Sequence, residues 1–228
     1  MSTDEFERGA GETVEQVAEL PAGERFAAAA RGSANPAALA WLAEGLRLDA
    51  AASVLDIGTG MGGPAGWLTE RYGCRVVGVE PAHAAARAAA TLFDVPVAQG
   101  GAVALPVRTD AFDAALLLGV LSVVDDPKAA LVEARRVARS LAVLEWCAQG
   151  ADDVSAGGSR FPTETSLLAL LDAAGWTVQQ SSALQLDAPH VWESAAEAVE
   201  APPDPDEQEV VAAIERGELA PFLAVALR

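Results

Sequence analysis

The chain has 228 residues, 51 % of them hydrophobic, so it is long and apolar enough for one α/β domain with a sizeable core. Its 33 acidic residues against 15 basic ones give a net charge of −18 at pH 7, and a surface this acidic repels nucleic acids and anionic lipids. The sequence has 2 cysteines, which is too few for a zinc-binding cysteine pattern and indicates no disulfide framework.

The residue pattern predicts helices and strands that alternate along the chain. A first helix is expected over 36–47, with Asn35 as its N-cap and Pro36 in its first position. After it we expect, in order, strand 53–58, helix 64–73, strand 75–80, helix 82–93, strand 95–100, strand 112–121, helix 126–138, strand 140–146, helix 163–176, strand 177–186, helix 209–217 and strand 222–228. The Gly/Ser/Asp-rich connection 148–164 is expected to be a mobile or substrate-covering loop.

This alternation predicts a Rossmann-like α/β fold. Strands that alternate with helices form a parallel sheet covered on both faces. The helix and strand that follow the sixth strand suit a seven-stranded, mostly parallel sheet with its last strand antiparallel. We expect residues 1–50 to form an N-terminal helical cap and 51–228 the core, as one domain overall. Ligands of such sheets bind at the carboxyl ends of the strands, near the point where the strand order reverses.

The stretch "VLDIGTGMGGPAGWL", Val54 to Leu68, predicts a nucleotide-binding loop between a strand and a helix. Its glycines satisfy the G-x-G-x-x-G pattern of NAD and FAD sites, and Glu80 ends the second strand, where an acid accepts hydrogen bonds from ribose hydroxyls. Both features also fit other nucleotides. Asp56, two residues before the first glycine, disfavours a pyrophosphate at this helix N-terminus. A cofactor that carries a sulfonium and an ammonium instead of phosphates tolerates this carboxylate well.

With these residues the sequence resembles the class I S-adenosylmethionine-dependent methyltransferases. The similarity is to the small-molecule type, related to ubiquinone and menaquinone biosynthesis methyltransferases, and it covers roughly residues 30–228. The segments that carry it, in order, are "VLDIGTGMGGPAGWL", "RVVGVEP", "GGAVALPVRTDAFDAALLLGVL", "DDPKAALVEARRVA" and "FPTETSLLALLDAAGW". The resemblance implies S-adenosyl-L-methionine as cofactor and S-adenosyl-L-homocysteine as product.

The resemblance also implies which residues bind the cofactor. By their places in these motifs they are Asp56, Gly58, Thr59, Gly60, Gly62, Glu80, Pro81, Gly101, Ala102, Leu118 and Gly119. The first five surround the methionine half and the ribose, Glu80 binds the ribose hydroxyls, and Pro81 packs against the adenine. The backbone after the third strand meets the adenine edge, and the end of the fourth strand offers backbone groups to the methionine amine. Because Glu80 ends a strand at the open mouth of the site, its replacement is expected to change folding stability little.

The sequence departs from the family pattern at two places that matter for the site. Gly101 stands where the family commonly has Asp, so adenine recognition is expected to depend on backbone and packing. No histidine follows the fourth strand, where the family often has one, so a general base must come from elsewhere. Arg31, before the first helix, is a candidate partner for the cofactor carboxylate, and a solvated arginine is the alternative.

Candidates for the acceptor side follow the fifth and sixth strands. Glu145 and His190 are the candidate general bases, with a partly solvated pocket carboxylate and a surface loop histidine as the alternatives. Trp146 and Trp192 are candidates to stack on an aromatic acceptor, and packing is their alternative. His83 is interpreted as structural or solvent-exposed, and Trp176 as a core residue together with the tryptophans at 41 and 67.

The predicted function is methyl transfer to a small-molecule acceptor at oxygen, carbon or nitrogen, with secondary metabolism as one setting. The alternative is a protein of this fold with a non-methylating activity, such as a cyclase, that retains the cofactor. We expect no metal, no nucleic acid or membrane partner, and a monomer or homodimer. The first 16 residues have no apolar stretch, and the most apolar segment, 114–124, is shorter than the about 20 residues that span a bilayer. A cytoplasmic location is therefore expected.

Overall fold

The computed structural model describes residues 14–30, 34–183 and 205–228 of the chain. The elements in chain order are α2 (Ala22–Ala28), α3 (Pro36–Leu46), β1 (Ser53–Ile57), α4 (Gly63–Tyr72), β2 (Arg75–Glu80), α5 (His83–Phe93), β3 (Val97–Gln99), β4 (Phe112–Leu118), α6 (Pro127–Val137), β5 (Ala138–Ala148), β6 (Val154–Ala156), β7 (Ser159–Phe161), α7 (Glu164–Ala173), β8 (Thr177–Ser182), α9 (Pro205–Glu215) and β9 (Leu219–Leu227). The predicted alternation of helices and strands is confirmed, and β6 and β7 are additional.

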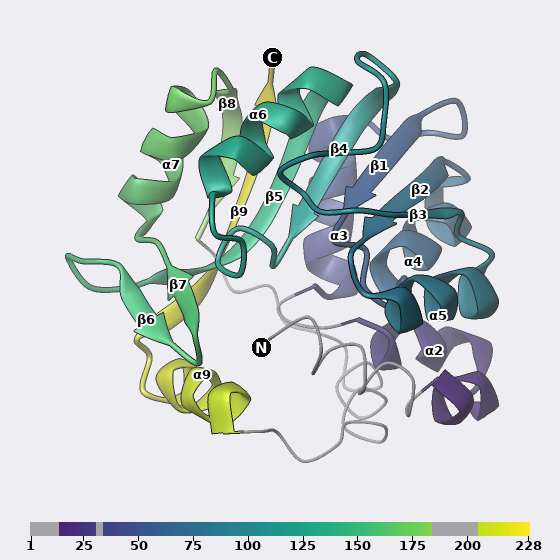
Figure 1. The fold of residues 1–228 in the computed structure, drawn as a ribbon, viewed down its shortest axis with the longest axis horizontal. Coiled ribbons are helices and arrows are strands. Elements are labelled where there is room, and N and C mark those ends of the chain that lie inside the picture. Colours follow the sequence, from purple (N-terminus) through teal and green to yellow (C-terminus); the bar gives the residue numbers. More distant parts are fainter. Residues whose placement is uncertain (1–13, 31–33, 184–204) are drawn as a thin grey trace.

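Seven strands form one twisted sheet in the order β3-β2-β1-β4-β5-β9-β8 (Figure 1). The pairs from β3 to β5 are parallel, whereas β9 runs antiparallel to both of its neighbours, β5 and β8. The predicted fold class, a Rossmann-like sheet with an antiparallel last strand, is therefore confirmed. The strand order reverses between β1 and β4, which places the expected ligand site at the carboxyl ends of these two strands.

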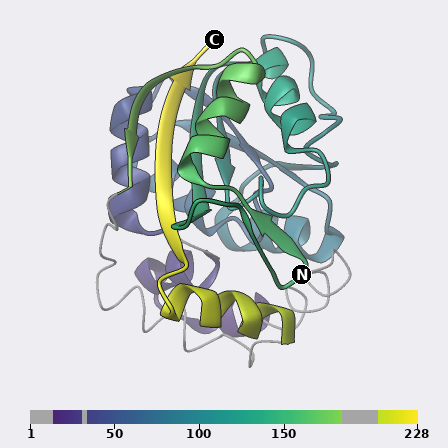
Figure 2. The same cartoon turned by 90° about the vertical axis from the view of Figure 1, so that its left-hand side faces the viewer.

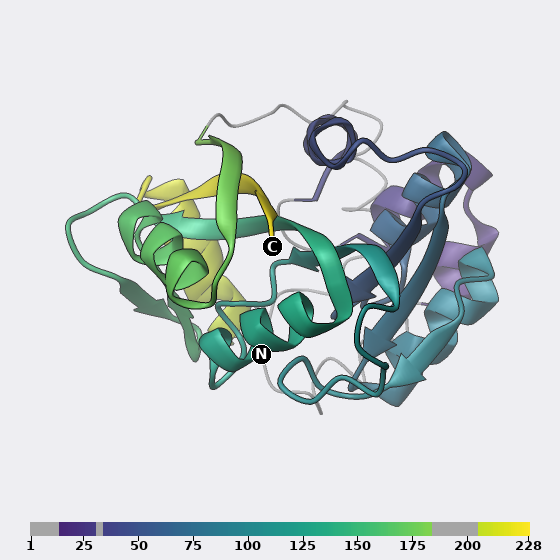
Figure 3. The same ribbon diagram turned by 90° about the horizontal axis from the view of Figure 1, so that it is seen from above.

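Helices cover both faces of the sheet. Helices α3 and α4 contribute Leu39 and Leu68 to one apolar cluster, which also contains Val54 of β1. Helices α6 and α7 contribute to the cluster on the opposite face, which contains Leu55 of β1. Figure 3 shows α3 and α6 on opposite sides of the sheet, and Figure 2 shows β9 between α3 and α7. Successive side chains of β1 thus enter different cores, as both faces of a parallel sheet require.

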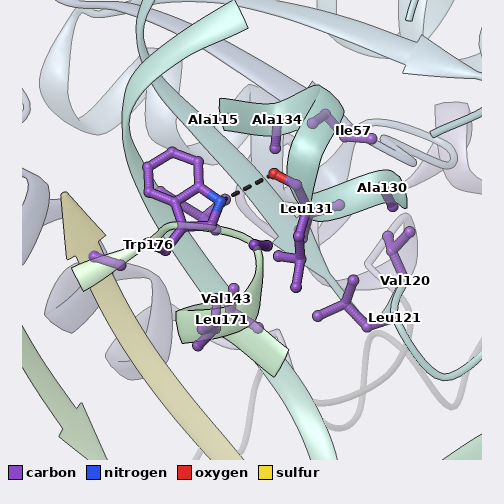
Figure 4. Packing of buried hydrophobic residues seen from close by; sticks show 14 of the residues in the cluster. Ile57, Ala115, Val120, Leu121, Ala130, Leu131, Ala134, Val143, Leu171 and Trp176 are labelled. Atoms are coloured by element: carbon purple, nitrogen blue, oxygen red, sulfur yellow. Dashed lines mark hydrogen bonds between the residues drawn. The ribbon is translucent and has the colours of Figure 1, made fainter. Parts of the chain in front are cut away.

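Trp176 anchors the cluster on the α6 and α7 face, which confirms it as a core residue. Its side chain is 2 % exposed, and its indole Nε1 donates a hydrogen bond to the carbonyl oxygen of Leu131 at 3.0 Å (Figure 4). Leu171 of α7 belongs to the same cluster. A buried tryptophan satisfies its one donor in this way while its ring fills the space between two helices. The other two predicted core tryptophans, at 41 and 67, are partly buried.

The helix starts follow from local capping chemistry. The Asn35 side chain accepts hydrogen bonds from Ala37 N and Ala38 N, and Pro36 occupies the first turn of α3, as predicted. Asp126 caps α6 in the same manner. Helix α4 begins without a side-chain cap, after Gly62 in a left-handed conformation. Its first turn therefore follows directly from the glycine loop.

The structure describes only part of the predicted N-terminal cap. Helix α2 packs on the start of α4, so closely that a Cβ atom on Gly63 would overlap the carbonyl oxygen of Phe26 and lie 2.7 Å from Ala30 N. Helix α3 packs on the sheet beside β5 and β9. The division of the chain at residue 50 stays a prediction.

The connection after β5 contains a β-hairpin where the sequence predicts only a loop. Strands β6 and β7 pair antiparallel, and Gly157 and Gly158 form the turn with φ of 54° and 69°. Such values suit glycine and match the turns of two-residue hairpins. Phe161 of β7 is buried in a small cluster with Leu219 of β9. The two adjacent glycines are a turn signal in the sequence. The strands on either side of this turn have only three residues each, which is too short for a periodic pattern that would predict them.

Candidate functional site

The glycine loop lies at the carboxyl end of β1, at the lower edge of the sheet in Figure 1. Gly58, Gly60 and Gly62 have φ of 74°, 56° and 86°, conformations that side chains rarely adopt. The amides of Gly58 and Thr59 donate to the carbonyl oxygen of Val79 at 2.8 and 3.2 Å. The loop is thus held against β2, and its tight turn needs glycine at each of the three positions.

Glu80, the predicted ribose ligand, also holds the glycine loop. Its Oε2 accepts from Gly60 N at 2.9 Å and its Oε1 from Ala82 N at 3.0 Å, and the residue is 4 % exposed. A buried carboxylate that accepts two backbone N–H groups contributes to the fold as well as to a ligand site. The expectation that its replacement leaves stability nearly unchanged is therefore revised.

Asp56 is a second buried carboxylate at this edge. It is 2 % exposed, and its Oδ2 accepts from the Thr59 hydroxyl at 2.7 Å. Burial raises the pKa of Asp56 to about 6, the Thr59 hydrogen bond lowers it, and the charge of Glu80 raises it again. Two carboxylates close enough to affect each other's ionisation favour a cationic ligand group at this site over a phosphate.

The end of β4 lies directly beside the glycine loop, because β4 pairs with β1. Leu118 is half-buried, and Gly119 has φ of 71° with no atom within 4 Å of an added Cβ. The Gly119 amide donates to Leu144 O at 2.7 Å, which ties the end of β4 to β5. Val120 packs on the loop, since a Cβ on Gly58 would lie 2.7 Å from Val120 Cγ2. This contact is not evident from the sequence.

The end of β3 completes the edge on the other side of Glu80. Gln99 pairs in register with Glu80, and its Nε2 donates to Pro81 O at 3.0 Å. Gly101 is exposed with no atom within 4 Å of an added Cβ, and Ala102 is half-buried. Sequence reasoning missed Gln99, although its position at the end of the third strand was a signal.

Glu145 near the end of β5 is buried among hydrogen-bond donors. Its Oε2 accepts from Leu121 N at 2.8 Å and Ser122 N at 3.2 Å, and its Oε1 from Ser122 Oγ at 3.0 Å and Trp146 N at 3.1 Å. Burial raises the pKa of Glu145 to about 7, against the effect of these donors. The residue is 1 % exposed. To accept a further proton, this carboxylate must give up one of four hydrogen bonds.

The remaining predicted residues divide into two groups. Trp146 is partly buried and packs against the cluster that contains Phe161. Arg31, His190 and Trp192 lie outside the described residues. Within the described ranges, no group of three His, Cys, Asp or Glu side chains is placed to hold a metal ion. The structure therefore brings the predicted cofactor-binding residues, apart from Arg31, to one edge of the sheet and leaves the acceptor side partly undescribed.

Comparison with known proteins identifies the fold and one domain. Residues 55–144 match the family model of a methyltransferase domain. No curated protein matches the chain. None of the helices in the described part of the chain has the length and hydropathy to cross a membrane.

Several solved structures share the fold at low sequence identity. The [4+2]-cyclase SpnF has a TM-score of 0.69 and 22 % identity, covering 83 % of this chain and 80 % of that one. A geranyl diphosphate C-methyltransferase from Streptomyces coelicolor, in complex with S-adenosyl-L-homocysteine, has a TM-score of 0.66 and 17 % identity over 83 % and 77 %. Phosphoethanolamine N-methyltransferase 2 from Haemonchus contortus, in complex with S-adenosyl-L-methionine, has a TM-score of 0.63 and 12 % identity over 83 % and 51 %. The chain therefore has the Rossmann-like fold of these proteins, and the methyltransferase domain model matches it from β1 into β5.

Proposed function

We propose that this protein transfers a methyl group from S-adenosyl-L-methionine to a small-molecule acceptor. The observation that carries the proposal is the glycine loop bound to Glu80, with Asp56 buried beside it, in the segment that matches the methyltransferase domain. A dinucleotide would place a pyrophosphate against these carboxylates, whereas S-adenosyl-L-methionine presents a sulfonium and an ammonium.

The proposed cofactor-binding residues are those of the predicted set. The backbone of the glycine loop and Asp56 would surround the methionine half, and Glu80 the ribose. The Gly119 carbonyl oxygen would accept from the ammonium, and the open space beside Gly101 would admit the adenine edge. Arg31 would pair with the cofactor carboxylate. When bound, the cofactor supplies a methyl group already activated on sulfur.

The protein's own task is then alignment and exclusion of water. Holding the acceptor in line with the methyl group can lower the activation barrier by about 7–11 kcal/mol. A base is required only if the attacking atom carries a proton that must leave. Glu145 and His190 are the proposed bases, and Trp146 and Trp192 are the proposed acceptor contacts. Glu145 already accepts four hydrogen bonds and would lose one of them on taking up a proton, so we favour His190 as the base.

We also propose the kind of acceptor and the cellular setting of the protein. The net charge of −18 favours a neutral or cationic small molecule over nucleic acid. A cytoplasmic monomer or homodimer of the ubiquinone-biosynthesis type, acting in secondary metabolism, fits the sequence motifs. The structural similarity to SpnF favours one second candidate, a cyclase-like activity that retains the cofactor without methylating.

Calorimetric titration tests the cofactor and mass spectrometry tests the reaction. S-adenosyl-L-homocysteine should bind and NADH should not, and tight NADH binding without response to either adenosyl compound would refute the proposal. With a true acceptor, methyl transfer adds one CH₂ unit to the product and releases S-adenosyl-L-homocysteine. An acceptor that changes structure at constant mass would instead support the cyclase-like activity.

A further inference from the structure

We propose that Glu145 is a positioning residue that holds the segment after β4 against the glycine loop. This inference rests on the proposed function, because the loop in question would bind the cofactor. Glu145 lies on β5, whereas the groups it binds belong mainly to the turn that follows β4. Its carboxylate thus joins two parts of the chain that are more than 20 residues apart in sequence.

The segment that Glu145 holds touches the proposed cofactor site at two points. Gly119 lies at the carboxyl end of β4 with open space beside its Cα, and Val120 packs on Gly58 of the glycine loop. Leu121 and Ser122, the next two residues, are the ones that Glu145 binds. Because Leu121 directly follows Val120 in the chain, displacement of Leu121 should disturb the contact of Val120 with the glycine loop.

Ser122 also connects this segment to the hairpin. Its N–H and hydroxyl groups both donate to Glu145, and its carbonyl oxygen accepts from Arg160 N of β7 at 2.9 Å. The residue is 7 % exposed. The hairpin, the end of β5 and the turn after β4 thus form one hydrogen-bonded unit, with the Glu145 carboxylate at its centre.

A carboxylate fits this position and an amide of the same size does not. All four contacts of Glu145 are N–H or O–H donors, so two acceptor oxygens are required. In Glu145→Gln the amide oxygen can accept from the Leu121 and Ser122 amides. The amide NH₂ then faces Trp146 N–H, and two donors oppose each other. The buried conflict should displace the turn.

The chain offers a matched control for this network at the opposite end of the sheet. Ser53 donates through its N–H and its hydroxyl to Asp113 Oδ2, at 3.0 and 2.7 Å. Ser53 and Ser122 are each 7 % exposed. Ser53→Ala and Ser122→Ala therefore each remove a buried serine hydroxyl that donates to a carboxylate, far from the proposed site in one case and beside it in the other. Ser53→Ala also removes the Oγ that accepts from Asp113 N at 3.2 Å, so the control loses at least as many hydrogen bonds.

The experiment is titration calorimetry of each full-length variant with S-adenosyl-L-homocysteine, together with thermal unfolding and hydrogen exchange of the 119–124 segment. Glu145→Gln and Ser122→Ala should weaken binding about ten-fold or more, equivalent to one lost hydrogen bond to a charged group. They should also speed exchange of the Leu121 amide. Ser53→Ala should lower the melting temperature and leave the affinity within about twofold of wild type.

Three outcomes decide between the possibilities. Folded Glu145→Gln and Ser122→Ala proteins that bind like wild type would overturn the inference, and so would an equal loss of affinity in Ser53→Ala. If Glu145→Gln does not fold, the milder Ser122→Ala decides by the same criteria. Failure of the wild-type protein to bind S-adenosyl-L-homocysteine would instead refute the proposed function, independently of Glu145.

Discussion

Replacement of Glu80 by alanine tests whether one carboxylate serves both the fold and the cofactor. The change removes the acceptors of Gly60 N–H and Ala82 N–H. The Ala82 amide bond is buried and the Gly60 bond is partly buried, so water can replace the second more easily than the first. A hydrogen bond to a charged group contributes about 1.5–3 kcal/mol, and the unpaired Ala82 amide should lower the free energy of unfolding by about that amount.

The expected effect on binding is of similar size. Loss of the two ribose hydrogen-bond acceptors and displacement of the Gly60 backbone should weaken S-adenosyl-L-homocysteine about ten- to a hundred-fold. Thermal unfolding measures the stability change, at about 2–4 °C for each kcal/mol in a domain of this size. Calorimetric titration well below the melting temperature measures the affinity.

Glu80→Gln is the matched variant. It retains one acceptor oxygen and the side-chain volume, so its stability should lie between those of wild type and Glu80→Ala, while its affinity falls. A melting temperature for Glu80→Ala equal to that of wild type would show that the two backbone hydrogen bonds contribute nothing. An affinity within about twofold of wild type would reject Glu80 as a ribose ligand.

Three further predictions concern the loop and its surroundings. Gly60→Val should abolish cofactor binding while circular dichroism stays unchanged, because φ of 56° and close backbone approach exclude a branched side chain; retained binding would place the ligand elsewhere. Gly63→Ala should lower stability by about 1–3 kcal/mol, since its Cβ would overlap the carbonyl oxygen of Phe26 in α2. Gly66→Ala meets an aromatic side chain instead and should cost less, so equal melting temperatures would contradict this packing. Burial raises the pKa of Asp56 from 3.8 to about 6, so the folded state binds its proton more tightly than the unfolded state does. The protonated Asp56 therefore stabilises the folded state fully below its unfolded pKa, and this stabilisation is lost as pH rises through the folded pKa. In wild type the free energy of unfolding, measured by urea denaturation, should fall between about pH 4 and about pH 7, and in Asp56→Asn this fall should be smaller. An unchanged pH profile of the free energy of unfolding would refute the prediction.

The sequence predicts the elements best where local chemistry determines them. The second strand was predicted over 75–80 and is found as Arg75–Glu80, and the Asn35 cap is found as predicted. The fifth strand is longer than the predicted 140–146, because α6 passes directly into β5 at Ala138 without a turn residue. Such a continuous passage leaves no signal of Gly or Pro to mark it.

Contacts between distant segments could not be predicted in the same way. The position of Glu145 at the carboxyl end of a strand was predictable, because parallel strands share one edge. Three of its four donors were not, since they belong to Leu121 and Ser122 in the turn after β4, more than 20 residues away in the sequence. The same holds for Val120 on Gly58, a contact between two loops of different strands.

The antiparallel strand β9 has a consequence for how the protein forms during its synthesis. Along the chain it is the last of the seven strands to emerge, yet in the sheet it lies between β5 and β8. The strands that carry the glycine loop can pair as soon as β4 is made, whereas β8 has no neighbour until Leu219–Leu227 arrives. The nascent chain therefore completes its nucleotide-binding half first. Until synthesis reaches β9, one edge of β5 has unpaired backbone N–H and C=O groups, and such an edge can pair with other chains.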